Sequence, residues 1–212
     1  MNAVIFDMDG VIFNTENLWR EGFILANKKY NLNLDENYRK TICGKSEDEI
    51  RNELKALYKN LDVNNYRDFI INYVNDEIKK LNYEIKDGFI DLINDLKNKN
   101  YKLALATSST RKRAEYLFKN KNIDINIFDV KIFSEDVGIK SKPDPYIFKL
   151  AAKLLNEDSS NCYVIEDSIN GIIAAKKGNF KPIMVIDLIE PDDYCTNNCY
   201  KILKSLKELN IW

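Results

Sequence analysis

The sequence predicts an α/β protein whose Rossmann-like core, a doubly wound parallel sheet, carries an inserted α-helical domain. Short apolar runs alternate with helical patterns over residues 82–212, which is typical of a parallel sheet with helices on both faces. One further apolar run, at residues 4–6, lies near the start of the chain. The residues between these parts show helical spacing only. We therefore assign 1–14 and 82–212 to the core and 15–81 to the inserted domain.

The expected strands are compact apolar runs, and the expected core helices follow them in alternation. The strands fall at residues 4–6, 102–106, 130–133, 162–165 and 183–186. The helices fall around residues 92–96, 110–121, 145–155 and 170–177. Pro145 stands where the first turn of a helix tolerates proline.

The inserted stretch reads as a bundle of about four helices. Its apolar residues recur at helical spacing, as at Ile50, Leu54 and Leu57. Ser46 followed by Glu49 matches a capping box at the start of one helix. All four prolines of the chain lie beyond residue 140, so the stretch contains no proline, and its only glycines are Gly22 and Gly44.

Composition excludes several classes of protein. The 212 residues are 45% hydrophobic with a net charge of −1, so no basic excess favours nucleic acid, and the default partner is a small molecule. No apolar run approaches the roughly 18 residues that span a bilayer, so no membrane association is expected. A signal peptide fits poorly because residues 3–6 read as a core strand. The four cysteines are expected to be reduced thiols, and the protein to be cytoplasmic.

The chain contains no histidine. This excludes Ser-His-Asp and Cys-His catalysis, histidine general bases and every histidine metal site. Proton transfer must fall to carboxylates, lysines, tyrosines or cysteines. A catalytic metal would need oxygen ligands, which favours magnesium, calcium or manganese.

Polar groups follow four of the expected strands, three of them directly and one, Lys142, in the loop after the strand at 130–133. They are Asp7 with Asp9, residues 107–109 (Thr-Ser-Ser), Lys142 and residues 166–167 (Glu-Asp). Each has an ordinary interpretation on its own: a turn, a helix cap, a solvated lysine or the acidic start of a helix. Because parallel strands bring their carboxyl ends to one sheet edge, the joint arrangement predicts a single site there.

Charge alone argues for a metal at this edge. Two unit charges about 4 Å apart repel by about 4 kcal/mol at an effective dielectric near 20. Asp7, Asp9, Glu166 and Asp167 could not all be ionised together without compensation. Lys142 and one divalent cation would still leave a net negative charge, so we expect one or more of the carboxyls to be protonated or directed away, and Asp9 is suited to carry a proton.

These motifs resemble the haloacid dehalogenase superfamily. The resemblance rests on residues 7–16 (DMDGVIFNTE), 106–109 (ATSS), 142–145 (KPDP) and 164–168 (VIEDS), followed by Gly171. The match is to its phosphatase and β-phosphoglucomutase-like branch, and all four superfamily motifs occur in order. The inserted stretch matches the helical cap of this branch, whose capped members are monomers by default.

The resemblance implies catalytic roles for named residues. Asp7 would be the nucleophile that forms an aspartyl-phosphate, and Asp9 the general acid and base. Thr107 and the neighbouring Ser108 would bind the transferring phosphoryl group, whose charge Lys142 would neutralise.

The resemblance also implies a magnesium site. Its ligands would be Asp7, the backbone carbonyl of Asp9, and Asp167. Glu166 would be a further ligand, bound directly or through water. The second aspartate of the first motif is typically missing from the dehalogenating members, so its presence favours phosphoryl chemistry.

The chain departs from its relatives at several cap positions. Asn14 stands where many carry aspartate, and a modest effect on the cap hinge is expected. The mutases place an arginine where Glu47 stands, to grip a second phosphate, and a histidine about where Trp19 stands. Gly44, Lys45, Glu47 and Trp19 are the candidate specificity residues. Glu47 could equally begin a helix, Trp19 could be cap core, and Lys45 could face the site or solvent.

The leading hypothesis is therefore a magnesium-dependent phosphatase for a small phosphorylated metabolite: a sugar, polyol or amino-alcohol phosphate. A β-phosphoglucomutase-like phosphomutase is the alternative, disfavoured by Glu47 and Trp19. A third possibility is a non-catalytic protein that binds phosphorylated metabolites on the same fold, which the intact motif residues disfavour.

Overall fold

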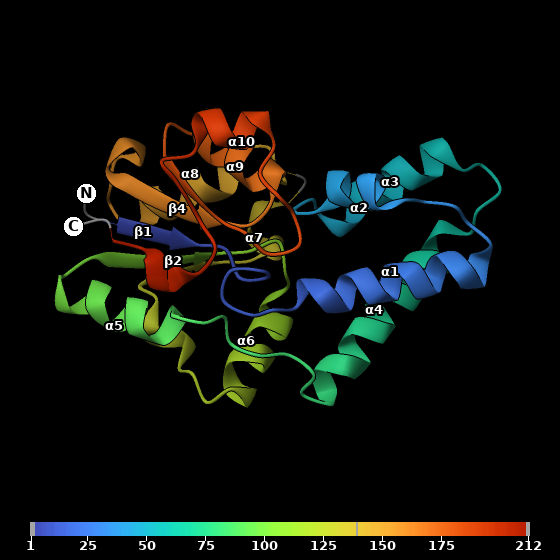
Figure 1. Cartoon of the computed structure of the whole chain (residues 1–212), viewed down its shortest axis with the longest axis horizontal. Helices are drawn as coiled ribbons and strands as arrows, with labels where there is room; N and C mark the ends of the chain where they lie inside the picture. Colours follow the sequence, from blue (N-terminus) through green and yellow to red (C-terminus); the bar gives the residue numbers. More distant parts are fainter. Residues whose placement is uncertain (1–2, 139, 211–212) are drawn as a thin grey trace.

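A six-stranded parallel sheet forms the centre of the molecule (Figure 1). The computed structural model describes residues 3–138 and 140–210. The strand order is β3-β2-β1-β4-β5-β6, and every pairing is parallel. The strands are β1 (Ala3–Phe6), β2 (Lys102–Ala106), β3 (Val130–Ile132), β4 (Cys162–Glu166), β5 (Lys181–Val185) and β6 (Lys201–Leu203).

The central strands are apolar on both sides because both faces of the sheet are covered. All four residues of β1 are buried, and their side chains alternate between two clusters of the core. Phe6 joins the cluster of α5 (Phe89–Asn98) and α6 (Arg111–Asn120). Ile5 joins the cluster of α8 (Tyr146–Leu154) and α9 (Ile169–Lys177). The predicted doubly wound sheet is confirmed.

Short elements complete the core beyond those that the sequence predicted. In β6 only Leu203 is buried, so no continuous apolar run marked this strand. The remaining elements are α7 (Ser134–Val137), α10 (Asp193–Asn198) and three 3₁₀ turns (Ile125–Ile127, Ser159–Asn161, Leu206–Glu208). Pro145, expected within the first turn of α8, is its N-cap residue.

Four helices follow β1 and lie together at one end of the molecule (Figure 1). They are α1 (Glu16–Tyr30), α2 (Glu36–Ile42), α3 (Glu47–Leu57) and α4 (Val63–Lys79), called here the four-helix segment. Their number agrees with the predicted bundle. Ser46 caps α3 as predicted, accepting a hydrogen bond from the Glu49 amide at 3.3 Å. The Glu49 carboxylate, however, accepts a hydrogen bond from the Ser141 hydroxyl in the core.

Two chain crossings connect the four-helix segment to the core, and they are bonded to each other. The Asn14 amide donates to the Glu84 carbonyl at 3.1 Å. The Asn14 side-chain oxygen accepts from the Glu84 amide at 2.5 Å. Asn14 therefore joins the outgoing and returning chains at the base of the segment.

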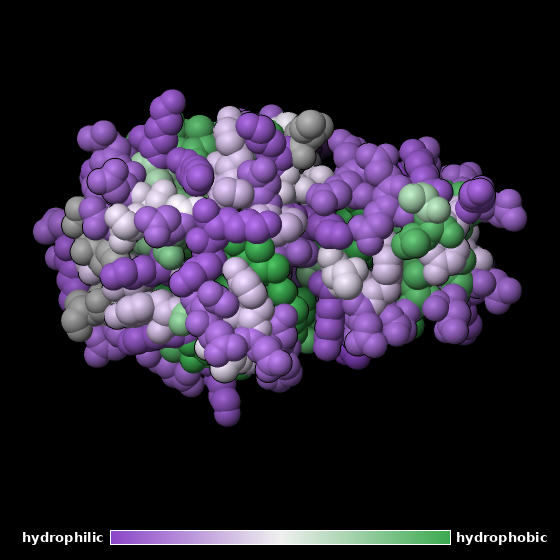
Figure 2. All heavy atoms as spheres, turned by 90° about the horizontal axis from the view of Figure 1, so that it is seen from above, coloured by the Kyte–Doolittle hydropathy of each residue, from purple (hydrophilic) through white to green (hydrophobic). Residues whose placement is uncertain are grey.

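The face shown in Figure 2 is largely hydrophilic, with apolar side chains near the junction between the large and small parts and on the small part itself. Across residues 3–138 and 140–210, no helix has the length and apolar character needed to cross a bilayer. All four cysteines are free thiols, in agreement with the expectation of reduced cysteines.

Candidate active site

The residues that follow β1, β2 and β4 meet at one edge of the sheet, beneath the four-helix segment. Asp7, Thr107 and Asp167 are all buried there, and so is Lys142. They line a cavity of about 410 Å³ that also takes residues from α1, α3 and α4 in its wall. The structure thus brings together the four polar groups that the sequence placed at strand ends.

Lys142 joins two of the acidic residues. Its Nζ lies 2.6 Å from Asp7 Oδ1 and 2.5 Å from Glu166 Oε1. The side chain is 2% exposed. Burial alone would lower its pKa, but the two carboxylates hold the pKa above its ordinary value, so the lysine is charged.

Glu166 is held by its own loop. Its Oε2 accepts hydrogen bonds from the Asp167 amide (3.0 Å), the Ser168 amide (2.9 Å) and the Ser168 hydroxyl (2.9 Å). A Cβ on Gly171 would lie 2.0 Å from the Glu166 carboxyl carbon, so only glycine fits at that position. Glu166 therefore fixes the position of Lys142, with its second oxygen already saturated by hydrogen bonds.

Asp7, Glu166 and Asp167 form a buried acidic cluster that fits a small divalent cation. One oxygen of each lies within 4.8 Å of the others. Burial raises the pKa of Asp7 to about 8, and burial and the neighbouring carboxylates raise the pKa of Asp167. Gly10, at φ +75°, leaves room for this cluster, because a Cβ there would lie 2.2 Å from Asp167 Oδ2. An all-oxygen donor set of this kind suits magnesium.

The Asp9 carboxylate is turned away from this cluster toward α6. Arg113 binds both of its oxygens at 2.7 Å, the Ser109 hydroxyl donates at 2.8 Å, and the Thr15 hydroxyl also donates. Burial would raise the pKa of Asp9, but these donors, Arg113 above all, hold it below its usual value. Of the two expected ways to relieve the charge, protonation or turning a carboxyl away, Asp9 in this arrangement shows the second: it is bound to Arg113 and ionised, and does not carry the proton for which it was considered suited.

The loop after β2 shows two kinds of contact. The Thr107 hydroxyl accepts from the Ser109 amide at 3.1 Å, which shapes the turn into α6. The Ser108 hydroxyl donates to the carbonyl of Gly44 at 3.0 Å, so it contacts the four-helix segment. Both residues line the cavity.

The four candidate specificity residues all line the same cavity. The Trp19 ring lies 5.5 Å from the Arg113 guanidinium, so it faces the core site. Lys45 pairs with Glu53 at 2.7 Å. Glu47 begins α3, as the structural interpretation expected, and its carboxylate also reaches the cavity.

Sequence reasoning missed four charged residues of the cavity: Glu16, Arg39, Arg67 and Arg113. One signal could have found Arg67, because it is a charged residue on the buried face of α4, between Val63 and Ile70. Burial raises the pKa of Glu16 to about 7, with the Asp9 charge adding to the effect.

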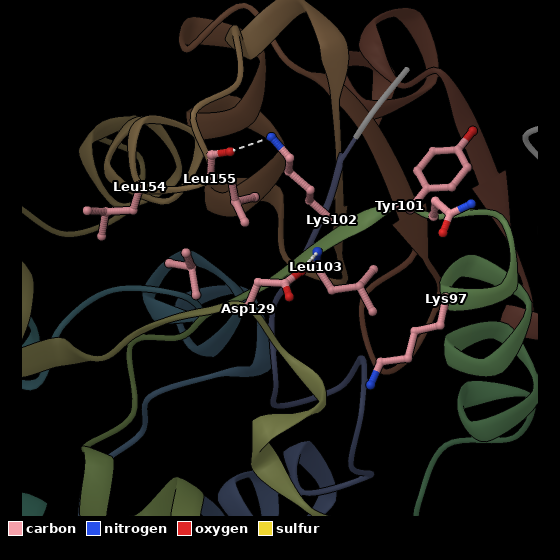
Figure 3. Close-up of a pocket in the computed structure, with 9 residues that line it drawn as sticks. Lys97, Tyr101, Lys102, Leu103, Asp129, Leu154 and Leu155 are labelled. Carbon is pink, nitrogen blue, oxygen red and sulfur yellow. Dashed lines mark hydrogen bonds between the residues drawn. The ribbon is translucent and has the colours of Figure 1, made fainter.

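A second hollow, of about 450 Å³, lies at the opposite edge of the sheet (Figure 3). Its polar groups support the fold. Asp129 accepts a hydrogen bond from the Leu103 amide at 2.8 Å, and Lys102 donates to the Leu155 carbonyl at 2.9 Å. Of the two hollows, only the first is lined by the buried carboxyl groups of Asp7 and Asp167 together with the buried Lys142.

Comparison with known proteins shows the family. A family model described as haloacid dehalogenase-like hydrolase matches residues 1–179. The phosphorylated carbohydrates phosphatase of Thermotoga maritima is 33% identical over 187 residues, which cover 86% of this chain and 84% of that protein. The β-phosphoglucomutase of Bacillus subtilis is 29% identical over 208 residues, which cover 89% of this chain and 88% of that protein. The solved β-phosphoglucomutase of Clostridium difficile superposes with a TM-score of 0.81 at 25% identity, covering 100% of this chain and 94% of that one.

The fold and the matching family model define a hydrolase on a Rossmann-like core. The chain belongs to the haloacid dehalogenase-like hydrolase family, as its motifs predicted. Within that family it is an enzyme of the phosphoric monoester hydrolase class.

Proposed function

We propose that the protein is a magnesium-dependent phosphatase that hydrolyses a small phosphorylated metabolite, a sugar, polyol or amino-alcohol phosphate, through an aspartyl-phosphate on Asp7. The observation that carries this proposal is the Lys142 ammonium, buried between Asp7 and Glu166 at the base of the cavity. A fixed cation beside a carboxylate nucleophile is suited to a dianionic phosphoryl group. Two relatives are named as phosphatases, one of phosphorylated carbohydrates and one of validoxylamine A 7'-phosphate, and they support the same chemistry.

In the first step Asp7 attacks phosphorus, and the bond from phosphorus to the leaving oxygen breaks as the Asp7–phosphorus bond forms. Lys142 and the Thr107–Ser108 loop bind the phosphoryl oxygens. Asp9 gives a proton to the leaving oxygen. For this, the Asp9 carboxyl must part from Arg113 and take up a proton when substrate enters.

In the second step a water molecule attacks phosphorus and the Asp7–phosphorus bond breaks. Asp9, now ionised, accepts the proton of that water. The contacts of Asp9 with Thr15 and Ser109 keep its carboxylate at the mouth of the cavity between the two steps.

Asp7, Asp167 and the Asp9 backbone carbonyl would hold the magnesium ion. Glu166 would act from further out, because Lys142 and Ser168 already occupy its oxygens. When bound, the ion supplies positive charge that offsets the crowded carboxylates and the phosphoryl group.

The four-helix segment would act as a cap, with residues 15–81 as a separate domain. Contacts across the cavity support this role: Ser108 donates to the Gly44 carbonyl, and Asn170 donates to the carbonyls of Thr41 (3.1 Å) and Cys43 (2.7 Å). A closed cap excludes water while the aspartyl-phosphate forms, and an open cap admits it afterwards.

A phosphomutase activity is the second candidate, favoured by relatives named β-phosphoglucomutase. Glu47 argues against it, since the mutases carry arginine at that position. A non-catalytic binding role is the least favoured, because every motif residue is present.

Two assays test the proposal. Hydrolysis of an aryl phosphate with magnesium separates an enzyme from a binding protein. Product analysis with a hexose 1-phosphate then separates a phosphatase, which releases inorganic phosphate, from a mutase, which yields the 6-phosphate. Absence of phosphate release from every substrate in a sugar, polyol and amino-alcohol phosphate panel would contradict the proposal.

A further inference from the structure

The cations that line the cavity are already paired. Among the described residues, five basic side chains line the cavity, and a carboxylate oxygen lies within 2.8 Å of each. The pairs are Arg39 with Glu36, Lys45 with Glu53, Arg67 with Glu47, Arg113 with Asp9, and Lys142 with Asp7. Lys142 and Arg113 belong to the catalytic edge. Of the three remaining pairs, only Arg67 with Glu47 has both members in the wall of the cavity, so it is the pair that a leaving group could meet.

The Arg67–Glu47 pair has two parallel hydrogen bonds. Arg67 Nε lies 2.9 Å from Glu47 Oε1, and Nη2 lies 2.7 Å from Oε2. Arg67 is 5% exposed and Glu47 33% exposed, so the arginine is the buried member. Arg51 adds a third contact to Glu47 at 3.1 Å. The same planar fork binds a phosphate or a ligand carboxylate equally well.

We propose that Glu47 occupies an anion-binding site formed by Arg67 and so restricts the enzyme to substrates with one phosphate and an uncharged, hydroxyl-bearing leaving group. The inference rests on the proposed phosphatase function and narrows its substrate class. A second phosphate would have to displace Glu47 or lie unpaired in the cavity.

The surroundings make an unpaired charge costly. Phe23, Ile50 and Ile70 line the same cavity and are buried. A phosphate group without a cationic partner would lose its hydration against this apolar wall. A cationic leaving group is not favoured either, because Arg67 and Arg51 already neutralise Glu47. Glu47 can still accept a hydrogen bond from a neutral hydroxyl.

Competition against aryl-phosphate hydrolysis tests the inference. Inhibition constants of a hexose 6-phosphate and a hexose 1,6-bisphosphate are measured for the wild-type protein, Glu47→Gln and Asp48→Asn. Asp48→Asn is the matched control, because it removes one negative charge from the next residue of α3, which is exposed. Thermal melting of each variant confirms folding.

In the wild type the bisphosphate should bind no more tightly than the monophosphate. Glu47→Gln frees the Arg67 fork and should strengthen bisphosphate binding about tenfold relative to the monophosphate, as expected for a charge-assisted contact. Asp48→Asn should leave the ratio of the two inhibition constants unchanged. The double variant Glu47→Gln, Arg67→Met should lose the tighter bisphosphate binding.

Three results would overturn the inference. The wild type could bind the bisphosphate much more tightly than the monophosphate, or folded Glu47→Gln could leave the ratio of the two inhibition constants unchanged. Asp48→Asn could also change that ratio as much as Glu47→Gln does. If Glu47→Gln does not fold, the inhibition constants of the two sugars for the wild type still test whether a second phosphate is bound. If no phosphate is hydrolysed at all, the proposed function fails, and direct calorimetric binding of the same two sugars tests the Arg67 site separately.

Discussion

The Arg113 guanidinium binds the Asp9 carboxylate through two hydrogen bonds of 2.7 Å, although 104 positions separate the two residues in the chain. The contact joins α6 to the loop after β1 and lies beside Trp19 of α1. Asp9, the expected general acid and base, is therefore ionised and bound to Arg113 before substrate binds. Substrate entry has to compete with an arginine for this carboxyl group.

Replacing Arg113 with methionine should raise the pKa of Asp9, because burial would no longer be opposed by the guanidinium. The limb of the kcat/KM profile that reports Asp9 should move to higher pH by about one pH unit or more. Arg111→Met is the matched control, since the Arg111 side chain is half exposed and its guanidinium lies 3.6 Å from Asp136. Identical profiles for Arg113→Met and wild type would show that Arg113 does not control Asp9.

Asp7→Asn should abolish turnover while the protein stays folded, because an amide is not a competent nucleophile here. The loss should reach at least about a thousandfold in kcat, and circular dichroism should be unchanged. Lys142 keeps its contact with Glu166 in this variant, so the site should not collapse. Substantial residual activity would show that a water molecule, and not Asp7, attacks phosphorus.

Removal of magnesium should stop the reaction, because the buried carboxylates need a counter-charge before a phosphate dianion can enter. Activity should vanish in excess EDTA and return with added magnesium. Asp167→Ala should raise the magnesium concentration for half-maximal activity about tenfold or more. Calorimetric titration of magnesium into both proteins gives a readout independent of turnover. Full activity in EDTA, with no metal carried through purification, would contradict the charge argument.

Asn170→Ala should weaken closure of the four-helix segment, because two hydrogen bonds to the carbonyls of Thr41 and Cys43 are lost. At about 1 kcal/mol each, their removal should raise KM several-fold to about thirtyfold and leave kcat less affected. Asn198→Ala is a suitable control, because Asn198 donates within its own helix to the Tyr194 carbonyl. Equal KM values for Asn170→Ala and wild type would mean that these bonds do not hold the segment closed.

Local patterns predicted most of the fold and the positions of the motif residues. Fully buried strands leave long apolar runs, so β1, β2 and β4 were evident, and Asp7, Thr107 and Glu166 stand directly at their ends. The strand β6 was missed because one buried residue in three leaves no pattern.

The side-chain partners were not predictable in the same way. Whether Arg113 meets Asp9, or Arg67 meets Glu47, depends on how helices far apart in the chain pack together. The sequence marked Glu47 as a candidate specificity residue or a helix start, and it does begin α3. Its two arginine partners, Arg51 and Arg67, could not be read from the sequence.

The bond between Asn14 and Glu84 has a consequence for how the enzyme can open. Because this bond fastens the two chain crossings to each other, we expect the proposed opening of the four-helix segment to be a rotation about the Asn14–Glu84 contact. Displacement about a pivot grows with distance from it. The far end of α1, about 22 Å along the helix, should therefore sweep a wide arc, while Thr15 stays beside Asp9 throughout the swing.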